Sequence, residues 1–249
     1  MDIDSFFEIA EKALAGDVSS QFELGKCFDM GIIVNQNFDQ AVYWYTKAAE
    51  QGDVKAQINL GVCYDFGNGV EQDYKTAVYW FRKAAEQEDT LALVWIGFYY
   101  YEGIGVEKDY EKAIYWYTKS AELGNAEATL RLGGYYDKIV QDHEKAVELY
   151  RKAAELGNAF SQNNLGVCYE NGWGVEKDYE KAIYWYIKSA EHGFAAAQDN
   201  LGRCYKNGYG LNQNYEKAVY WLTKAAEQGE DLAIKRLSEL KKKGILSDE

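Results

Sequence analysis

The sequence of 249 residues predicts an all-α solenoid, in which helix–turn–helix repeats stack one after another. Three observations predict this fold. A Leu-Gly pair recurs at a nearly constant spacing, glycines follow it at a fixed distance, and the residues between these markers place apolar side chains at helical intervals. The chain has no proline and no sustained alternation of the strand type, so helices joined by glycine turns account for all of it.

The Leu-Gly pair sets the period of the array. It occurs as Leu24-Gly25, Leu60-Gly61, Leu132-Gly133, Leu165-Gly166 and Leu201-Gly202, with Ile96-Gly97 as the third copy and Leu237 in a degenerate last copy. Successive copies are 36 residues apart, except for one spacing of 33 after the fourth copy. We therefore expect one continuous array, with an N-terminal capping half-repeat over 1–17, six repeats over 18–230 and a C-terminal capping helix over 231–249.

The second repeat shows why its first half is helical. Ala56, Leu60 and Tyr64 lie on one face at helical spacing, and Gly61 allows a neighbouring helix to approach closely. The glycines of 67–69 then end this helix, because glycine adopts left-handed conformations without steric cost. We call the first helix of each repeat helix A.

The second half of the repeat predicts another helix, helix B. Asp73 is its expected N-cap. Its apolar stripe alternates small and large side chains: Ala77, Trp80, Phe81, Ala84 and Ala85. Other repeats end in a glycine that is expected to cap helix B, whereas the second repeat has Glu88 at that position. The fourth repeat lacks three loop residues near 136–142, where we expect a local change in superhelical curvature.

The repeat reads Ala-x3-Leu-Gly-x2-Tyr-x2-Gly-x-Gly-Val-x2-Asp-Tyr-x-Lys-Ala-x2-Trp-Tyr-x-Lys-Ala-Ala-Glu-x-Gly, and it resembles the Sel1-like repeat over about residues 18–237. That family is related to the tetratricopeptide repeat and has a longer loop between its helices. The resemblance implies a right-handed α/α superhelix with helix A on the concave side, and an adaptor or scaffold that binds proteins. Cysteine-rich secreted members bind β-lactams weakly, but their paired cysteines are missing here, so a β-lactam-binding hydrolase is only a remote alternative.

The cysteines predict neither disulfides nor a metal site. Each follows the Leu of its repeat by three residues: Cys27, Cys63, Cys168 and Cys204. Equivalent Cα atoms in neighbouring repeats are expected roughly 8–10 Å apart, which is too far for a disulfide. No Cys-x-x-Cys pair indicates zinc, and the two histidines, His143 in the shortened loop and His192, form no cluster with other ligands. We expect buried thiols, no metal and no cofactor.

The formal net charge of −13 restricts the partners. An acidic chain repels phosphate groups, so we expect neither nucleic acid nor an anionic membrane surface as a partner. A basic protein or peptide is favoured electrostatically, although the charge could also serve only to keep the array in solution. The sequence has no basic and apolar leader at its start and no apolar run of 18 residues, so we expect a cytoplasmic monomer.

Differences between repeats indicate where a partner binds. Residues 105–126 and 174–195, which cover a loop and helix B, differ at only three of 22 positions. The helices A before them, 91–101 and 160–170, are far less alike. A helix face that recognises a partner would differ between repeats in this way, while the loop and helix B stay nearly constant. The alternative is that the differences arose by sequence drift.

On a tetratricopeptide-like geometry, the groove-facing positions of helix A lie five and two residues before the Leu and two, five and six residues after it. The expected partner-binding residues, at these positions or next to them, are Ile58, Val62, Phe66, Leu91, Val94, Trp95, Phe98, Tyr101, Leu130, Arg131, Asn163, Asp199 and Arg203. They predict an aromatic centre in repeats two to four and a polar flank after it. The alternative is that Val94, Trp95 and Phe98 pack against adjacent helices.

A second aromatic stripe lies two residues after the first alanine of helix B: Tyr43, Tyr79, Tyr115, Tyr184 and Tyr220. These tyrosines either form an exposed row on the convex side of the array or cover the ridge of helix B between repeats.

The predicted function is a non-catalytic adaptor or scaffold that binds a peptide or protein segment in the groove of helices A. The alternative is an inhibitor, such as an immunity protein that neutralises a basic toxin or enzyme, and the charge motivates it. The Gly-x-Gly motifs recur with the repeat and lack the Lys-Ser/Thr of a phosphate-binding loop, so we interpret them as turns and not as part of an active site.

Overall fold

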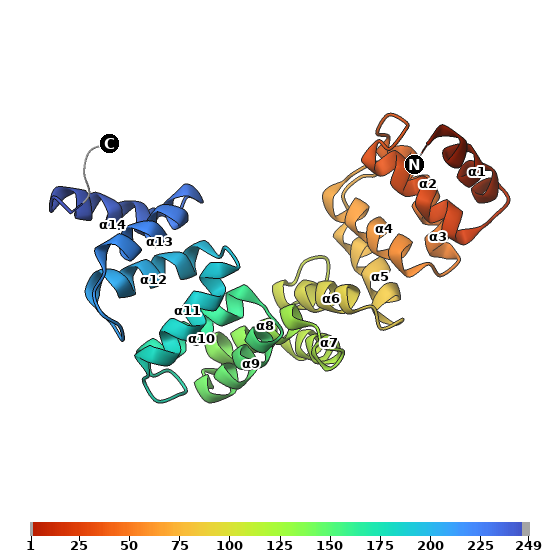
Figure 1. Cartoon of the computed structure of the whole chain (residues 1–249). Coiled ribbons are helices and arrows are strands. Elements are labelled where there is room, and N and C mark those ends of the chain that lie inside the picture. The colour runs from red at the N-terminus through yellow and green to blue at the C-terminus, as the bar shows by residue number, and fades with distance from the viewer. Residues whose placement is uncertain (1, 246–249) are drawn as a thin grey trace. The chain divides into compact units, whose positions relative to one another are not determined.

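The computed structural model describes residues 2–245, and all the regular structure in this range is helical (Figure 1). Its elements are α1 (Ile3–Leu14), α2 (Val18–Met30), α3 (Phe38–Glu50), α4 (Val54–Phe66), α5 (Tyr74–Ala85), α6 (Thr90–Glu102), α7 (Tyr110–Glu122), α8 (Ala126–Tyr135), the π-helical turn η1 (Tyr136–Val140), α9 (His143–Glu155), α10 (Ala159–Asn171), α11 (Tyr179–Glu191), α12 (Ala195–Asn207), α13 (Tyr215–Glu227) and α14 (Asp231–Lys242).

The chain forms two compact units, Met1–Leu123 with α1 to α7 and Gly124–Glu249 with α8 to α14. Within each unit, every helix packs against the next one in the sequence, and α14 also contacts α12. Helices A are α2, α4, α6, α8, α10 and α12, and the helix after each of them is its helix B. The predicted all-α repeat array is therefore confirmed. That α1 and α14 cap one continuous solenoid stays a prediction.

The ends of the helices follow from the predicted capping residues. Asp73 accepts a hydrogen bond from the backbone N–H of Lys75 at 2.9 Å and begins α5. Gly67 ends α4 in the left-handed conformation, with φ of 73°. Glu88 also takes a left-handed conformation, with φ of 61°, where the other repeats place glycine. This residue therefore holds a backbone conformation that disfavours a side chain.

The glycine of each Leu-Gly pair allows helix A to pack closely on helix B. A Cβ atom on Gly97 would lie 2.6 Å from Cε1 of Tyr117, and one on Gly166 would lie 2.6 Å from Cε1 of Tyr186. Both rings are buried, so they have little room to move. This contact confirms the close approach predicted from the sequence.

The second glycine of each Gly-x-Gly motif packs against the preceding repeat. A Cβ atom on Gly105 would lie 2.6 Å from the carbonyl carbon of Tyr74, at the start of α5. Gly210 has the same relation to Tyr179 at the start of α11, at 2.5 Å from its Cβ atom. These motifs are turns between helix A and helix B, as predicted, and they also pack against the preceding repeat.

The shortened loop of the fourth repeat forms the π-helical turn η1, which continues directly from α8. Gln141 follows in a left-handed conformation, with φ of 60°. The prediction that His143 lies in this loop is wrong, because it is the first residue of α9. Its Nδ1 atom lies 2.9 Å from Oδ1 of Asp137 in η1.

All four cysteines are buried thiols, as predicted. Burial raises the pKa of Cys63, Cys168 and Cys204 to about 12. These thiols therefore stay protonated at neutral pH and act as small apolar core residues.

Candidate functional site

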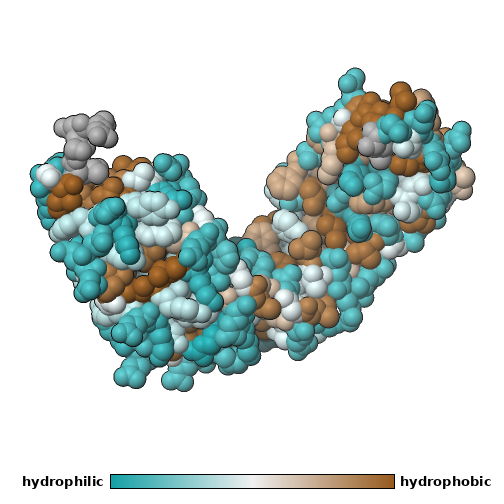
Figure 2. Space-filling model, in the orientation of Figure 1, coloured by the Kyte–Doolittle hydropathy of each residue, from teal (hydrophilic) through white to brown (hydrophobic). Residues whose placement is uncertain are grey.

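At helical spacing, the predicted binding positions fall on one side of each helix A, and we call this side the helix-A face. In the first unit it includes side chains of α4 and α6, and two of them are mainly exposed: Phe66 at 64% and Leu91 at 59%. Ile58, Val62, Val94 and Tyr101 are half-buried. Apolar and polar surface alternate over both units in the view of Figure 2.

Trp95 is the centre of an aromatic cluster on this face. Its ring stacks on that of Phe81 in α5, with centroids 5.5 Å apart and an interplanar angle of 11°. The ring of Phe98 meets it edge to face at 6.4 Å. Trp95 and Phe98 both remain partly exposed, so they pack against a neighbouring helix and also contribute to the surface.

Two carboxylates on helices A of the first unit, Asp29 and Asp65, take part in no ion pair among the described residues. The hydroxyl of Tyr45 donates a hydrogen bond of 3.0 Å to Asp29 of α2, and burial together with the nearby charge of Asp29 raises the pKa of Tyr45. Asp65 of α4 lies beside the hydroxyl of Tyr99. Over the described residues of the first unit, ion pairs join only residues three or four apart, and none includes Asp29 or Asp65.

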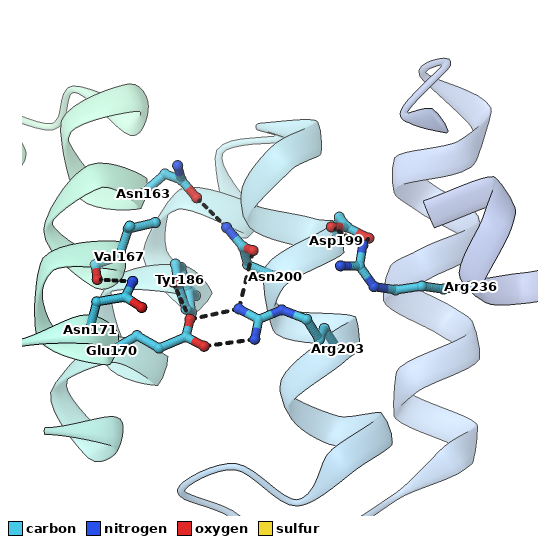
Figure 3. A network of polar contacts seen from close by, with 9 residues as sticks. All are labelled: Asn163, Val167, Glu170, Asn171, Tyr186, Asp199, Asn200, Arg203 and Arg236. Carbon is cyan, nitrogen blue, oxygen red and sulfur yellow. Dashed lines mark hydrogen bonds and ion pairs between the residues drawn. The ribbon is translucent and has the colours of Figure 1, made fainter. Parts of the chain in front are cut away.

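The helix-A face of the second unit is instead crosslinked by its own polar side chains (Figure 3). Arg203 of α12 donates two hydrogen bonds of 2.6 Å to Glu170 of α10, and the hydroxyl of Tyr186 donates a third of 2.7 Å to the same carboxylate. The side-chain amide of Asn200 donates a hydrogen bond of 3.0 Å to Oδ1 of Asn163. These contacts join consecutive helices A.

The same pattern continues to α14. Arg236 of α14 pairs with the buried carboxylate of Asp199, and Lys206 pairs with Glu239 at 2.8 Å. The polar members of the predicted site, Asn163, Asp199 and Arg203, are therefore all bonded within the chain.

The Glu170 carboxylate is held in its charged form. Burial alone would raise its pKa, but the hydrogen bonds from Arg203 and Tyr186 outweigh burial, so its pKa lies below the ordinary value. The bidentate geometry fixes the guanidinium, and the pair joins α10 to α12 as a rigid contact.

In the fourth repeat, Leu130 is half-buried on α8, and Arg131 is exposed and pairs with Glu127 one turn earlier, at 2.7 Å. These two positions contribute apolar and charged surface to the second unit.

Sequence reasoning missed the links between helices A. The signal available in the sequence was a pair of opposite charges about one repeat apart: Glu170 with Arg203, and Asp199 with Arg236. Position alone gave no reason to choose these pairs among 40 acidic and 27 basic residues.

The second aromatic stripe is exposed on the helices B. Its five tyrosines are each 50–52% exposed: Tyr43, Tyr79, Tyr115, Tyr184 and Tyr220. Each ring lies edge to face with the tryptophan that follows it, and the lysine one turn later lies over it. The stripe therefore covers the tryptophans and is also accessible.

The described residues include no group of three or more His, Cys, Asp or Glu side chains that could hold a metal ion. A shallow depression of about 400 Å³ lies beside Tyr100, Lys108 and Lys112, at the loop before α7. No helix in this part of the chain is both long and apolar enough to cross a bilayer.

The helix pairs, the glycine contacts and the loops define a repeat protein of the Sel1 type. The Sel1 repeat model matches six consecutive segments: 18–53, 54–89, 90–125, 126–158, 159–194 and 195–230. The chain therefore belongs to the Sel1 repeat family, as the resemblance predicted.

Two solved structures are similar in both sequence and fold. A protective antigen of uropathogenic Escherichia coli strains, with an SLR fold, is 35% identical with a TM-score of 0.90, over 97% of this chain and 52% of the antigen. This chain thus spans about half the length of that protein. A Sel1 repeat protein from Oxalobacter formigenes is 37% identical with a TM-score of 0.77, over 90% of this chain and 88% of that one.

An immunity protein from Pseudomonas aeruginosa shares the fold at 22% identity and a TM-score of 0.54, over 87% of this chain and 83% of that protein. No curated protein matches the sequence.

Proposed function

We propose that this protein is a non-catalytic adaptor or scaffold that binds a peptide or protein segment on its helix-A face. The observation that carries the proposal is the exposure of large apolar side chains there, above all Phe66 and Leu91. Exposed apolar groups next to polar ones are typical of interaction surfaces. Trp95 and Phe98 add aromatic groups that are already held in place, so binding would order few side chains.

The first test uses substitutions that leave the core intact. Phe66→Ser and Leu91→Ser change side chains that are more than half exposed, so the fold should survive both. A lysate of the source organism is passed over immobilised wild type and over the double variant, and each retained protein is identified. Its affinity is then measured with purified components.

The matched control is Tyr79→Ser and Tyr115→Ser on the helices B, at similar exposure. A partner that loses at least tenfold in affinity for the helix-A variant, about 1.4 kcal/mol, and keeps its affinity for the control supports the proposal. Equal binding by all three proteins would place the interface elsewhere.

The second candidate is an inhibitor that binds and neutralises a basic toxin or enzyme. The net charge of −13 favours it, because opposite charge accelerates encounter with a basic protein. Its test is the association rate with the captured partner at low and high salt. A rate that is independent of ionic strength would exclude charge steering. A hydrolase has only family analogy in its favour, and measuring turnover and acylation with a β-lactam would test it.

A further inference from the structure

The acidic charge of the chain is concentrated in its first unit. Met1–Leu123 contains 21 acidic and 10 basic residues, a formal net charge of −11, whereas Gly124–Glu249 contains 19 acidic and 17 basic residues, a net charge of −2. The second unit also neutralises its helix-A face with its own arginines, as Figure 3 shows. The two units therefore present different surfaces to a charged partner.

The contact around Glu170 has a direct equivalent in the first unit. The carboxylate of Glu170 receives a hydrogen bond from Tyr186, sixteen residues later, and pairs with Arg203, which is 33 residues later. Asp29 likewise receives a hydrogen bond from Tyr45, also sixteen residues later. The residue 33 positions after Asp29 is Val62, so at this point the chain provides an apolar side chain and no cation.

A second carboxylate lies at the equivalent position one repeat further on, with Phe81 in place of the tyrosine sixteen residues later. Asp65 lies 33 residues before Phe98, which again is apolar. The two carboxylates thus lie one repeat apart, each followed in the next helix A by an apolar, half-buried side chain.

We propose that the helix-A face of the first unit binds a cationic segment in which arginine side chains alternate with large apolar ones. An arginine of the segment pairs with Asp29 or Asp65, as Arg203 pairs with Glu170 within the chain, and its apolar residues cover Val62, Phe98 and Trp95. This inference rests on the proposed function and specifies the chemistry of the partner.

The spacing of the segment follows from the geometry. Packed helices lie roughly 8–10 Å apart, and an extended peptide rises about 3.3 Å per residue. One arginine at every third residue therefore matches one carboxylate per repeat. Guanidinium is preferred to ammonium because it binds a carboxylate through two hydrogen bonds.

The probe is a fluorescein-labelled peptide of twelve residues with arginine at every third position and leucine or phenylalanine between. Binding to the full chain is followed by fluorescence anisotropy. Two control peptides are compared with this arginine peptide. In one, glutamate replaces every arginine, and in the other, serine replaces every apolar residue. We expect only the arginine peptide to bind, and we expect its affinity to fall about tenfold or more between 50 and 300 mM salt because exposed charges are screened.

Asp29→Asn with Asp65→Asn removes both charges and leaves oxygen atoms that can still accept from Tyr45 and Tyr99. Two partly exposed ion pairs correspond to about a tenfold loss of affinity. The control is Asp39→Asn on α3 with Glu86→Gln, which directly follows α5; it changes the net charge equally and should alter binding less than twofold.

A third variant, Val62→Arg, provides the cation from within the chain. It should pair with Asp29, keep the fold and weaken binding of the arginine peptide. Equal binding of the glutamate peptide, or unchanged affinity in both the double variant and Val62→Arg, would overturn the inference, as would no binding of the arginine peptide. If Phe66→Ser and Leu91→Ser reduce binding while the charge variants do not, the proposed function stands and the charged partner is excluded.

Discussion

Two adjacent glycines of α8 test how helix A packs on helix B. Gly133 belongs to the Leu-Gly pair and faces Tyr150 of α9, whereas a Cβ atom on Gly134 would have no atom within 4 Å. Both residues lie in the same helix, so both substitutions by alanine change helix propensity alike. The difference between them isolates the contact with Tyr150.

The geometry gives the size of the effect. A Cβ atom on Gly133 would lie 2.7 Å from both Cδ1 and Cε1 of Tyr150 and 3.4 Å from the Cβ atom of Leu149. Carbon atoms pack at about 3.5–4.0 Å, so the two helices must separate or the buried ring must move. Overpacking of this kind costs about 1–3 kcal/mol, and alanine recovers about 1 kcal/mol of helix propensity. We expect Gly133→Ala to destabilise the fold by up to about 2 kcal/mol and Gly134→Ala to stabilise it by about 0.5–1 kcal/mol, so the two variants should differ by about 1–3 kcal/mol.

The assay is urea unfolding followed by far-UV circular dichroism, with unfolding midpoint and slope compared for wild type and both variants. A double-mutant cycle with Tyr150→Val identifies the source, because valine lacks both ring carbons that the new methyl group would meet. The loss caused by Gly133→Ala should largely disappear in that background. If Gly133→Ala is as stable as Gly134→Ala, or its loss is unchanged with Tyr150→Val, the packing argument is refuted.

Three further predictions concern a backbone conformation, an ion pair and the buried thiols. Glu88→Gly should raise the free energy of unfolding by about 0.5–1 kcal/mol, since glycine relieves the left-handed conformation; a lower melting temperature would contradict this. Glu170→Gln should destabilise the fold at neutral pH by about 1–3 kcal/mol through the loss of the charged pair with Arg203. Because the pKa of Glu170 is lowered in the folded state, its contribution is present above the ordinary carboxyl pKa of 4.5 and is lost as pH falls through the lowered pKa. The stability curves of wild type and variant should therefore converge as the pH falls below 4.5, and parallel curves would refute this. Finally, the four buried cysteines should react with a thiol reagent only in denaturant, and rapid labelling of the native protein at pH 8 would contradict their burial.

The period of the sequence was enough to predict the helix pairs, the turns and the repeat boundaries. These features depend on local chemistry: Asp73 begins a helix, Gly67 ends one, and the Leu-Gly glycine fits against a ring. Each of these constraints lies within one repeat or between neighbouring ones, so each appears as a residue at a fixed position. The π-helical turn after α8 was not predictable, because a loop shortened by three residues can close in several ways.

The candidate site was predicted less completely because side-chain pairing depends on contacts between repeats. The pattern identified positions on helix A, but it did not distinguish Asp199, which is buried against Arg236, from Leu91, which is exposed. The aromatic positions were ambiguous for a related reason. Trp95 stacks on Phe81 and also remains partly exposed, so both interpretations of it describe part of the structure.

The near-identity of residues 105–126 and 174–195 has a physical explanation in these contacts. Shared positions include Gly105 and Gly174, which leave no room for a side chain, and Tyr117 and Tyr186, whose rings fill the space opposite a glycine. The serine at the same position of each copy also donates a hydrogen bond to a carbonyl oxygen 30 residues earlier in the chain. The contacts of Gly105 and Gly174 join two repeats, whereas the ring and serine contacts hold the two helices of one repeat together, so these positions tolerate little change. Exposed positions of the helix-A face, such as Phe66 and Leu91, lack this restriction because their side chains meet solvent, so they can vary without loss of the fold.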